Sequence, residues 1–136
     1  MTAPSPKLVF NRSDKTVVVI EDDRDLADML CLLLEAEGFV CHRAFTGKSG
    51  IALATRSGAH AMLLDYMLPD MSGAEVGNQL RRDPSMSHLK IFMCTSTPEE
   101  TVRPMFSGYD GYFLKPVHHT QLVKALDAGF AAASSS

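Results

Sequence analysis

Carboxylate, hydroxyl and ammonium side chains follow four short apolar runs of the sequence and could together support phosphoryl transfer. The residues in question are Glu21, Asp22, Asp65, Thr95 and Lys115. Clustered carboxylates repel one another, and Mg²⁺ relieves this repulsion because it prefers oxygen ligands, often one or two carboxylates with waters and phosphate. Phosphoryl transfer depends on positioning and charge stabilisation, which Lys115 and Thr95 could supply. Asp65 stands alone after its run, so it is the best candidate nucleophile for an aspartyl phosphate, with Mg²⁺ held by Glu21 and Asp22.

These residues meet only if the apolar runs are parallel strands of one sheet. Short β-branched or apolar runs alternate with segments of helical periodicity. The expected strands span residues 16–20, 39–43, 61–64, 89–94 and 112–114, and the expected helices span 26–34, 48–56, 74–82, 98–107 and 122–129. Such alternation predicts an α/β fold with a doubly wound parallel sheet and helices on both faces. Ligands of such sheets bind outside the carboxyl ends of the strands, which is where the candidate side chains lie.

The fourth expected helix contains Pro104, which removes a hydrogen bond and clashes with the preceding turn if it lies in a helix interior. We therefore expect this helix to be short, kinked or late in starting.

Length and composition predict one domain. The chain has 136 residues, 46% of them apolar, which suffices for a substantial core. We expect a flexible extension over residues 1–14, a folded domain over 15–130 and a disordered tail over 131–136. The formal charge of −3 argues against direct binding to nucleic acid.

The cysteine count and the apolar runs bear on the compartment. Three cysteines, without CxxC spacing, indicate reduced thiols. The start of the chain lacks the apolar core of a signal peptide, and the longest apolar run, residues 29–34, is too short to cross a bilayer. We therefore expect a soluble, cytoplasmic protein without membrane contact.

Four segments resemble the receiver domains of two-component response regulators, of the chemotaxis-regulator type. VVVIEDD (17–23) is similar to the first strand of that family with its acidic pair, and LLDYMLPDMSG (63–73) to its phosphorylation segment. FMCTS (92–96) resembles the fourth strand with its switch hydroxyl, and GYFLKP (111–116) the lysine-proline loop. The resemblance covers about residues 16 to 130 and implies a flavodoxin-like, five-stranded sheet of order 2-1-3-4-5.

The resemblance also implies residue roles. Asp65 would accept the phosphoryl group from a histidine kinase or a histidine phosphotransfer protein, in an Mg²⁺-dependent reaction. Asp65 would share the metal with Glu21, Asp22 and the backbone carbonyl of Met67. The domain would act as a phosphoacceptor that assists its own phosphorylation and dephosphorylation, and not as an enzyme with a separate substrate.

The switch roles implied by the resemblance fall to Thr95 and Tyr112. Thr95 and Lys115 would contact the phosphoryl group, and Tyr112 would turn inward on activation, although simple packing is an equal alternative for Tyr112. The segment from Thr95 to Lys115 is about two residues shorter than is typical of the family and holds Pro104. This segment forms the usual partner-binding face of the family, so the downstream partner stays open. A homodimer through the fourth-helix face is possible in such domains, and the oligomeric state is also open. The domain could be a stand-alone regulator or part of a larger protein.

Two other functions fit parts of the same pattern. An Mg²⁺-dependent phosphohydrolase of the haloacid-dehalogenase type would need an acid two residues after the nucleophile, and Met67 occupies that position. An interaction module with this fold but without phosphorylation would have no need for the full set of acidic, hydroxyl and lysine residues. The sequence therefore favours a phosphorylation-controlled switch or phosphorelay intermediate.

Overall fold

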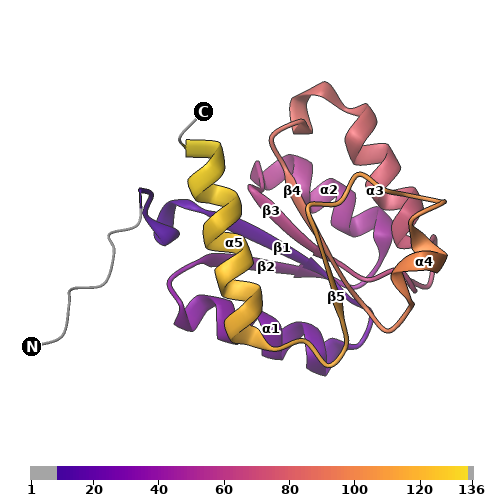
Figure 1. The fold of residues 1–136 in the computed structure, drawn as a ribbon, viewed down its shortest axis with the longest axis horizontal. Helices are drawn as coiled ribbons and strands as arrows, with labels where there is room; N and C mark the ends of the chain where they lie inside the picture. Colours follow the sequence, from indigo (N-terminus) through magenta and orange to yellow (C-terminus); the bar gives the residue numbers. More distant parts are fainter. Residues whose placement is uncertain (1–8, 135–136) are drawn as a thin grey trace, which may run out of the picture.

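Five parallel strands form one sheet at the centre of the computed structural model, which describes residues 9–134 (Figure 1). In chain order the strands are β1 (Thr16–Ile20), β2 (Val40–Ala44), β3 (Ala61–Leu64), β4 (Lys90–Thr95) and β5 (Gly111–Leu114). Their order across the sheet is β2-β1-β3-β4-β5. The predicted doubly wound, flavodoxin-like fold is therefore confirmed, and each predicted strand lies within a residue or so of the observed one.

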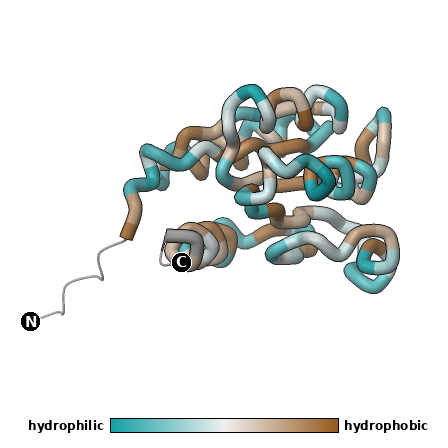
Figure 2. Tube along the Cα trace, turned by 90° about the horizontal axis from the view of Figure 1, so that it is seen from above, coloured by the Kyte–Doolittle hydropathy of each residue, from teal (hydrophilic) through white to brown (hydrophobic). Residues whose placement is uncertain are grey.

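Helices cover both faces of the sheet. They are α1 (Arg24–Ala36), α2 (Gly47–Ser57), α3 (Gly73–Arg82), α4 (Glu99–Val102) and α5 (His119–Ser134), with short 3-10 helices at Arg12–Asp14 and Pro84–Met86. Helices α1 and α5 lie on one face, and α2 and α3 lie on the other (Figure 1). Apolar residues concentrate along the central strands, and hydrophilic residues gather at the outer turns (Figure 2).

Successive residues of β1 serve the two faces in turn. Val17 and Val19 pack with α1 and α5, whereas Val18 and Ile20 pack with α2 and α3. All four side chains are buried, as expected for a parallel strand with helices on both sides. This double burial explains why TVVVI is a continuous apolar run.

The helix α4 is a single turn, as Pro104 led us to expect. It spans only Glu99–Val102, and the chain then turns so that the Met105 and Phe106 amides donate to the Val102 carbonyl. Phe106 is buried and its ring packs against Gly77 of α3. A buried aromatic residue therefore holds this segment where further helical turns were expected.

Contacts and helical structure extend to both ends of the described chain. Arg12, inside the expected flexible extension, forms ion pairs with Asp127 of α5 and Glu37 at the end of α1. The helix α5 continues to Ser134, into the expected tail, because its last turns are rich in alanine, the best helix former. The remaining parts of the two expected segments, residues 1–8 and 135–136, lie outside the described residues. Within residues 9–134, no helix has both the length and the apolar character to cross a membrane.

Two helical glycines should respond in opposite directions to substitution by alanine. A Cβ at Gly77 would lie 2.5 Å from the Phe106 ring, whereas a Cβ at Gly129 would meet nothing closer than 3.5 Å. We expect Gly77→Ala to lower the free energy of unfolding by about 1–2 kcal/mol, because overpacking outweighs the gain in helix propensity. The matched variant Gly129→Ala should raise it by up to about 1 kcal/mol. Urea denaturation measures both, and a Gly77→Ala protein as stable as wild type would contradict the packing described for Phe106.

Candidate functional site

The predicted chemical residues meet at the carboxyl edge of the sheet. Glu21 follows β1, Asp65 follows β3 and Thr95 ends β4, and these three are the buried polar or charged residues within the described part of the chain. Their neighbour Asp22 is exposed. Strands β1, β3 and β4 are adjacent, with Ile20 beside Leu64 and Leu64 beside Met93, so β1 and β3 end together and β4 runs two residues further. The sheet thus gathers groups that are far apart in sequence.

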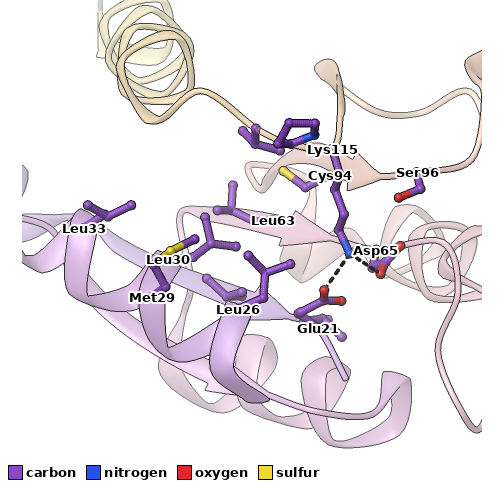
Figure 3. A pocket seen from close by; sticks show the side chains of 14 residues that line it. Glu21, Leu26, Met29, Leu30, Leu33, Leu63, Asp65, Cys94, Ser96 and Lys115 are labelled. Carbon is purple, nitrogen blue, oxygen red and sulfur yellow. Dashed lines mark hydrogen bonds and ion pairs between the residues drawn. The ribbon is translucent and has the colours of Figure 1, made fainter. Parts of the chain in front are cut away.

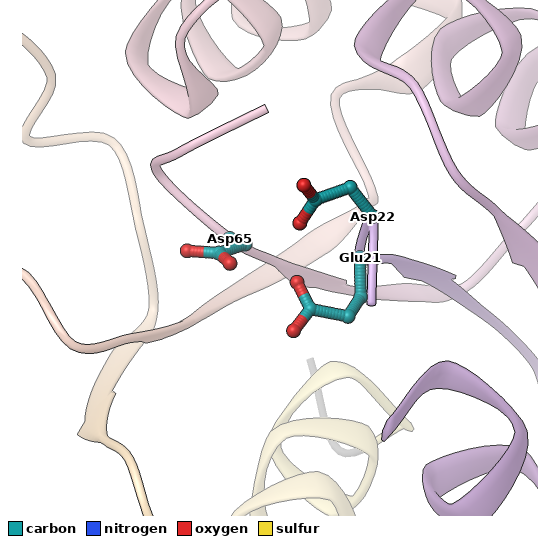
Figure 4. Close-up of side chains that lie close together, drawn as sticks. All are labelled: Glu21, Asp22 and Asp65. Carbon is teal, nitrogen blue, oxygen red and sulfur yellow. The ribbon is translucent and has the colours of Figure 1, made fainter. Parts of the chain in front are cut away.

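Three carboxylates converge at this edge. Glu21, Asp22 and Asp65 each offer an oxygen, and the three oxygens lie within 4.8 Å of one another (Figure 4). The Glu21 Oε2 atom is buried and has no hydrogen-bond partner among the described residues. A buried carboxylate oxygen normally has a partner, and an all-oxygen donor set with open positions suits Mg²⁺. The acidic cluster therefore fits this cation.

Lys115 neutralises part of this negative charge. Its Nζ atom donates to Glu21 Oε1 at 2.6 Å and to Asp65 Oδ2 at 2.9 Å (Figure 3). Burial lowers the pKa of Lys115, but the two carboxylates outweigh this effect and raise it, so the side chain stays an ammonium. One positive charge thus lies between two buried carboxylates.

The pKa values of the two carboxyl groups, Glu21 and Asp65, shift in opposite directions. Burial, reinforced by the charge of Asp65, raises the pKa of Glu21 to about 7. Burial acts in the same direction on Asp65, but interactions with Glu21, Lys115 and Thr95 outweigh it and lower the pKa of Asp65. Asp65 is therefore the ionised member of the pair, the form that a nucleophilic carboxylate requires.

The loop after Asp65 is tightly built. The Met67 amide donates to Asp65 Oδ1 at 3.3 Å, and the Gly73 amide donates to the Tyr66 carbonyl at 2.7 Å. A Cβ at Gly73 would lie 2.2 Å from the Asp65 carbonyl oxygen, so only glycine allows α3 to begin so close to the acidic edge. The Met67 side chain points to solvent.

Asp70 is a positioning residue that the sequence did not reveal. Its carboxylate accepts from the amides of Gly47 and Lys48, at 2.8 and 2.9 Å. These are unpaired amides of the first turn of α2, where a negative charge is favourable. The only signal in the sequence is a glycine at a helix start, which is too weak to identify the partner.

Thr95 and Tyr112 lie next to the acidic cluster and are linked through Thr97. The buried Thr95 hydroxyl accepts from the Thr97 amide at 3.2 Å, and the Tyr112 hydroxyl donates to the Thr97 carbonyl at 2.6 Å. Burial raises the pKa of Tyr112 to about 12, so this hydroxyl keeps its proton. Tyr112 also packs edge-on against Tyr109, with ring centroids 5.3 Å apart. Tyr112 is therefore half-buried beside the site and does not contact the carboxylates.

An apolar cavity of about 440 Å³ opens beside the carboxylates. Leu26, Met29, Leu30 and Leu33 of α1 line one side, and Pro116 and Val117, after a cis Lys115–Pro116 bond, line the other. Glu21, Asp65 and Lys115 stand at its polar end (Figure 3). The acidic edge is therefore open toward α1.

Comparison with known proteins identifies the family. The family model for the response regulator receiver domain matches residues 17–127. The sensory transduction protein RegX3 of Mycolicibacterium smegmatis is 38% identical over 115 residues, and the phosphate regulon transcriptional regulatory protein PhoB of Pseudomonas aeruginosa is 31% identical over 116 residues. These matches cover 83% and 84% of the chain but 49% and 51% of those two proteins. The chain thus spans about half the length of the curated relatives it matches.

Solved structures share the fold over almost their entire length. A receiver domain protein of Methanospirillum hungatei superposes with a TM-score of 0.81 at 24% identity, covering 89% of this chain and 96% of that one. The response regulator TrrA of Thermotoga maritima, solved with Mg²⁺ and BeF, gives a TM-score of 0.74 at 20% identity, covering 85% and 98%. With the family match and the acidic pocket of Glu21, Asp22 and Asp65, these results confirm the predicted membership: the chain belongs to the response-regulator receiver domains, phosphoacceptor modules of two-component signalling.

Proposed function

We propose that Asp65 accepts a phosphoryl group from a histidine kinase or a histidine phosphotransfer protein, and that phosphorylation controls binding of a downstream partner at the surface of α4 and β5. The observation that carries this proposal is the buried Asp65 carboxylate, which lies within 4.8 Å of the Glu21 and Asp22 oxygens and accepts a hydrogen bond from the Lys115 ammonium. The carboxylate thus faces both a cation site and a fixed positive charge. An incoming phosphoryl group would meet neutralising charge from both.

Each residue has a distinct task in this proposal. Glu21, Asp22 and Asp65, with the Met67 carbonyl, would hold Mg²⁺, which supplies charge neutralisation to the phosphoryl oxygens when bound. The Asp65 carboxylate attacks phosphorus in line with the leaving nitrogen of a phosphohistidine, and the phosphorus–nitrogen bond breaks. Lys115 exchanges its contact with Asp65 for a phosphoryl oxygen, and the Thr95 hydroxyl donates to another. The domain assists its own phosphorylation and dephosphorylation in this way.

The hydrogen bond from Tyr112 to Thr97 offers a route from the site to the α4–β5 surface. If Thr95 moves toward a phosphoryl oxygen, Thr97 moves with it, because the Thr97 amide donates to the Thr95 hydroxyl. The Thr97 carbonyl then withdraws from the Tyr112 hydroxyl, and the Tyr112 ring is free to turn inward. Two arrangements of one hydrogen-bonded segment give the bistable element that a phosphorylation switch needs.

The names of the relatives suggest, by analogy, the compartment and the signalling role of this domain. RegX3 is named as a sensory transduction protein and PhoB as a transcriptional regulatory protein. We infer a comparable cytoplasmic signalling role, with a histidine kinase as phosphoryl donor. A homodimer through the α4 face stays a prediction, and so does the absence of direct contact with nucleic acid by this domain.

Mg²⁺ should stabilise the protein, and Asp22→Asn should weaken the effect. A ligand present at a hundred times its Kd adds about 2.7 kcal/mol to the free energy of unfolding, so the melting temperature of wild type should rise by several degrees. Asp22→Asn removes a ligand charge and should lose most of this rise. Asp23→Asn is the matched control, because Asp23 caps α1 through the Leu26 amide and asparagine caps equally well. Equal Mg²⁺-dependent rises in wild type and Asp22→Asn would contradict the cation site.

Acetyl phosphate with Mg²⁺ should add one phosphoryl group to wild type and none to Asp65→Asn. The asparagine keeps the size of the side chain but has no nucleophilic carboxylate oxygen. Intact mass spectrometry in parallel with an EDTA-treated sample measures the reaction, and Asp23→Asn should be labelled like wild type. Labelled Asp65→Asn at the same site would contradict the assignment. If wild type is not labelled, beryllofluoride binding separates a strict need for the cognate donor from a domain that is not phosphorylated at all.

A further inference from the structure

Two cysteines that the phosphorylation chemistry does not use meet inside the core. Cys31 lies in the middle of α1, Cys41 lies in the edge strand β2, and both are buried. Their Sγ atoms are 2.6 Å apart. The covalent S–S bond of a disulfide is about 2.05 Å long, so the sulfurs need to approach by only about half an ångström to bond. The packing of α1 on β2 thus brings the pair almost to bonding distance.

We propose that Cys31 and Cys41 form a reversible intramolecular disulfide when the protein meets a peroxide. This is a modification site separate from the acidic edge, and it does not depend on the proposed phosphorylation of Asp65. Cys94 lies on β4, which β1 and β3 separate from β2, and it is not part of the pair.

The hydrogen bond between the two thiols shifts their pKa values in opposite directions. The hydrogen bond with Cys41 lowers the pKa of Cys31, and the positive charge of Arg43 acts in the same direction against burial. The same hydrogen bond raises the pKa of Cys41, and burial adds to this effect. One thiol of the pair is thus the better thiolate, which is the form that attacks a peroxide, and the other keeps the shared proton. Burial raises the pKa of Cys94 to about 12, so this third thiol is a poor nucleophile at neutral pH.

A hollow of about 490 Å³ leads to the pair. Cys41 lines it together with Arg43, His42, Arg24, Asp28, Phe45 and Leu53. Hydrogen peroxide is small enough to use this route, and the Cys41 side of the pair faces it. A bulky reagent would be excluded, since only 8% of Cys41 and 2% of Cys31 is exposed.

The oxidation proceeds in two balanced steps. One thiolate of the pair attacks one peroxide oxygen, the O–O bond breaks, and the departing hydroxide takes up a proton to become water, leaving a sulfenic acid on that sulfur. The other thiol then loses its proton and attacks the oxidised sulfur, the S–S bond forms, the S–O bond breaks, and a second water leaves. Together the two thiols lose two electrons and two protons, and peroxide is reduced to two waters. A dithiol reductant reverses the change.

The test uses the full chain, fully reduced and then treated with hydrogen peroxide under native conditions. After catalase treatment, denaturation and alkylation with iodoacetamide, the intact mass should show a single alkyl group and the loss of two hydrogen atoms. Peptide mapping without reductant should join the Cys31 and Cys41 peptides. The melting temperature should rise, because the bond closes a loop within the unfolded chain, and dithiothreitol should reverse both changes.

Matched variants separate the pair from the third cysteine. Cys94→Ala should form the same disulfide and take up no alkyl group after oxidation. Cys41→Ala should form none and should keep the melting temperature of its reduced form; Cys31→Ala replaces it if that variant does not fold. Three alkylated thiols in peroxide-treated wild type would overturn the proposal, as would a link that includes Cys94, a link between chains or direct conversion to sulfinic acid.

Discussion

The Lys115 ammonium between the carboxylates of Glu21 and Asp65 is the interaction on which the arrangement of the site depends. It joins the ends of three strands, β1, β3 and β5, through two hydrogen bonds at a buried edge. Without Lys115, two carboxylates in a poorly solvated position would repel each other, and one of them would have to take up a proton. Lys115 lowers the pKa of both carboxyl groups, and Asp65, whose pKa lies below its usual value, stays ionised. The chemical competence of Asp65 is thus a property of the strand order, which sets β3 between β1 and β4.

The same edge shows how charge and packing are divided between the two faces of the sheet. The loop after Asp65 is held by backbone contacts and by Asp70 at the start of α2, on the α2–α3 face. The other face, under α1, is lined with leucines and opens as an apolar cavity beside the carboxylates. The backbone around Asp65 is thus fixed on the α2–α3 face of the sheet, and the cavity lies beside Asp65 on the α1 face. The exposed Met29 side chain lines this opening.

Much of this structure follows from the sequence because its signals are local. The strands could be located because β1 and β3 are apolar on both faces, and the site could be inferred because parallel strands align their carboxyl ends. Tertiary contacts decided the remaining features. The single turn of α4 follows from Pro104, but its continuation depends on the fit of Phe106 against Gly77. The partners of Arg12 and Asp70 are side chains or amides more than twenty residues away, and no periodicity predicts such pairs. The approach of Cys31 to Cys41 likewise depends on the angle at which α1 crosses β2.

The ion pairs of Arg12 have a practical consequence for how this domain can be handled. Arg12 precedes β1 at the amino edge of the sheet, and its partner Asp127 lies in the second half of α5, which runs back toward that same edge (Figure 1). The acidic cluster lies at the opposite end of β1, roughly 17 Å away for a five-residue strand. A fluorophore or surface tether attached near Arg12 or near the end of α5 would therefore lie at the edge of the sheet opposite the phosphorylation site. Such a probe could report on the domain without blocking access to Asp65.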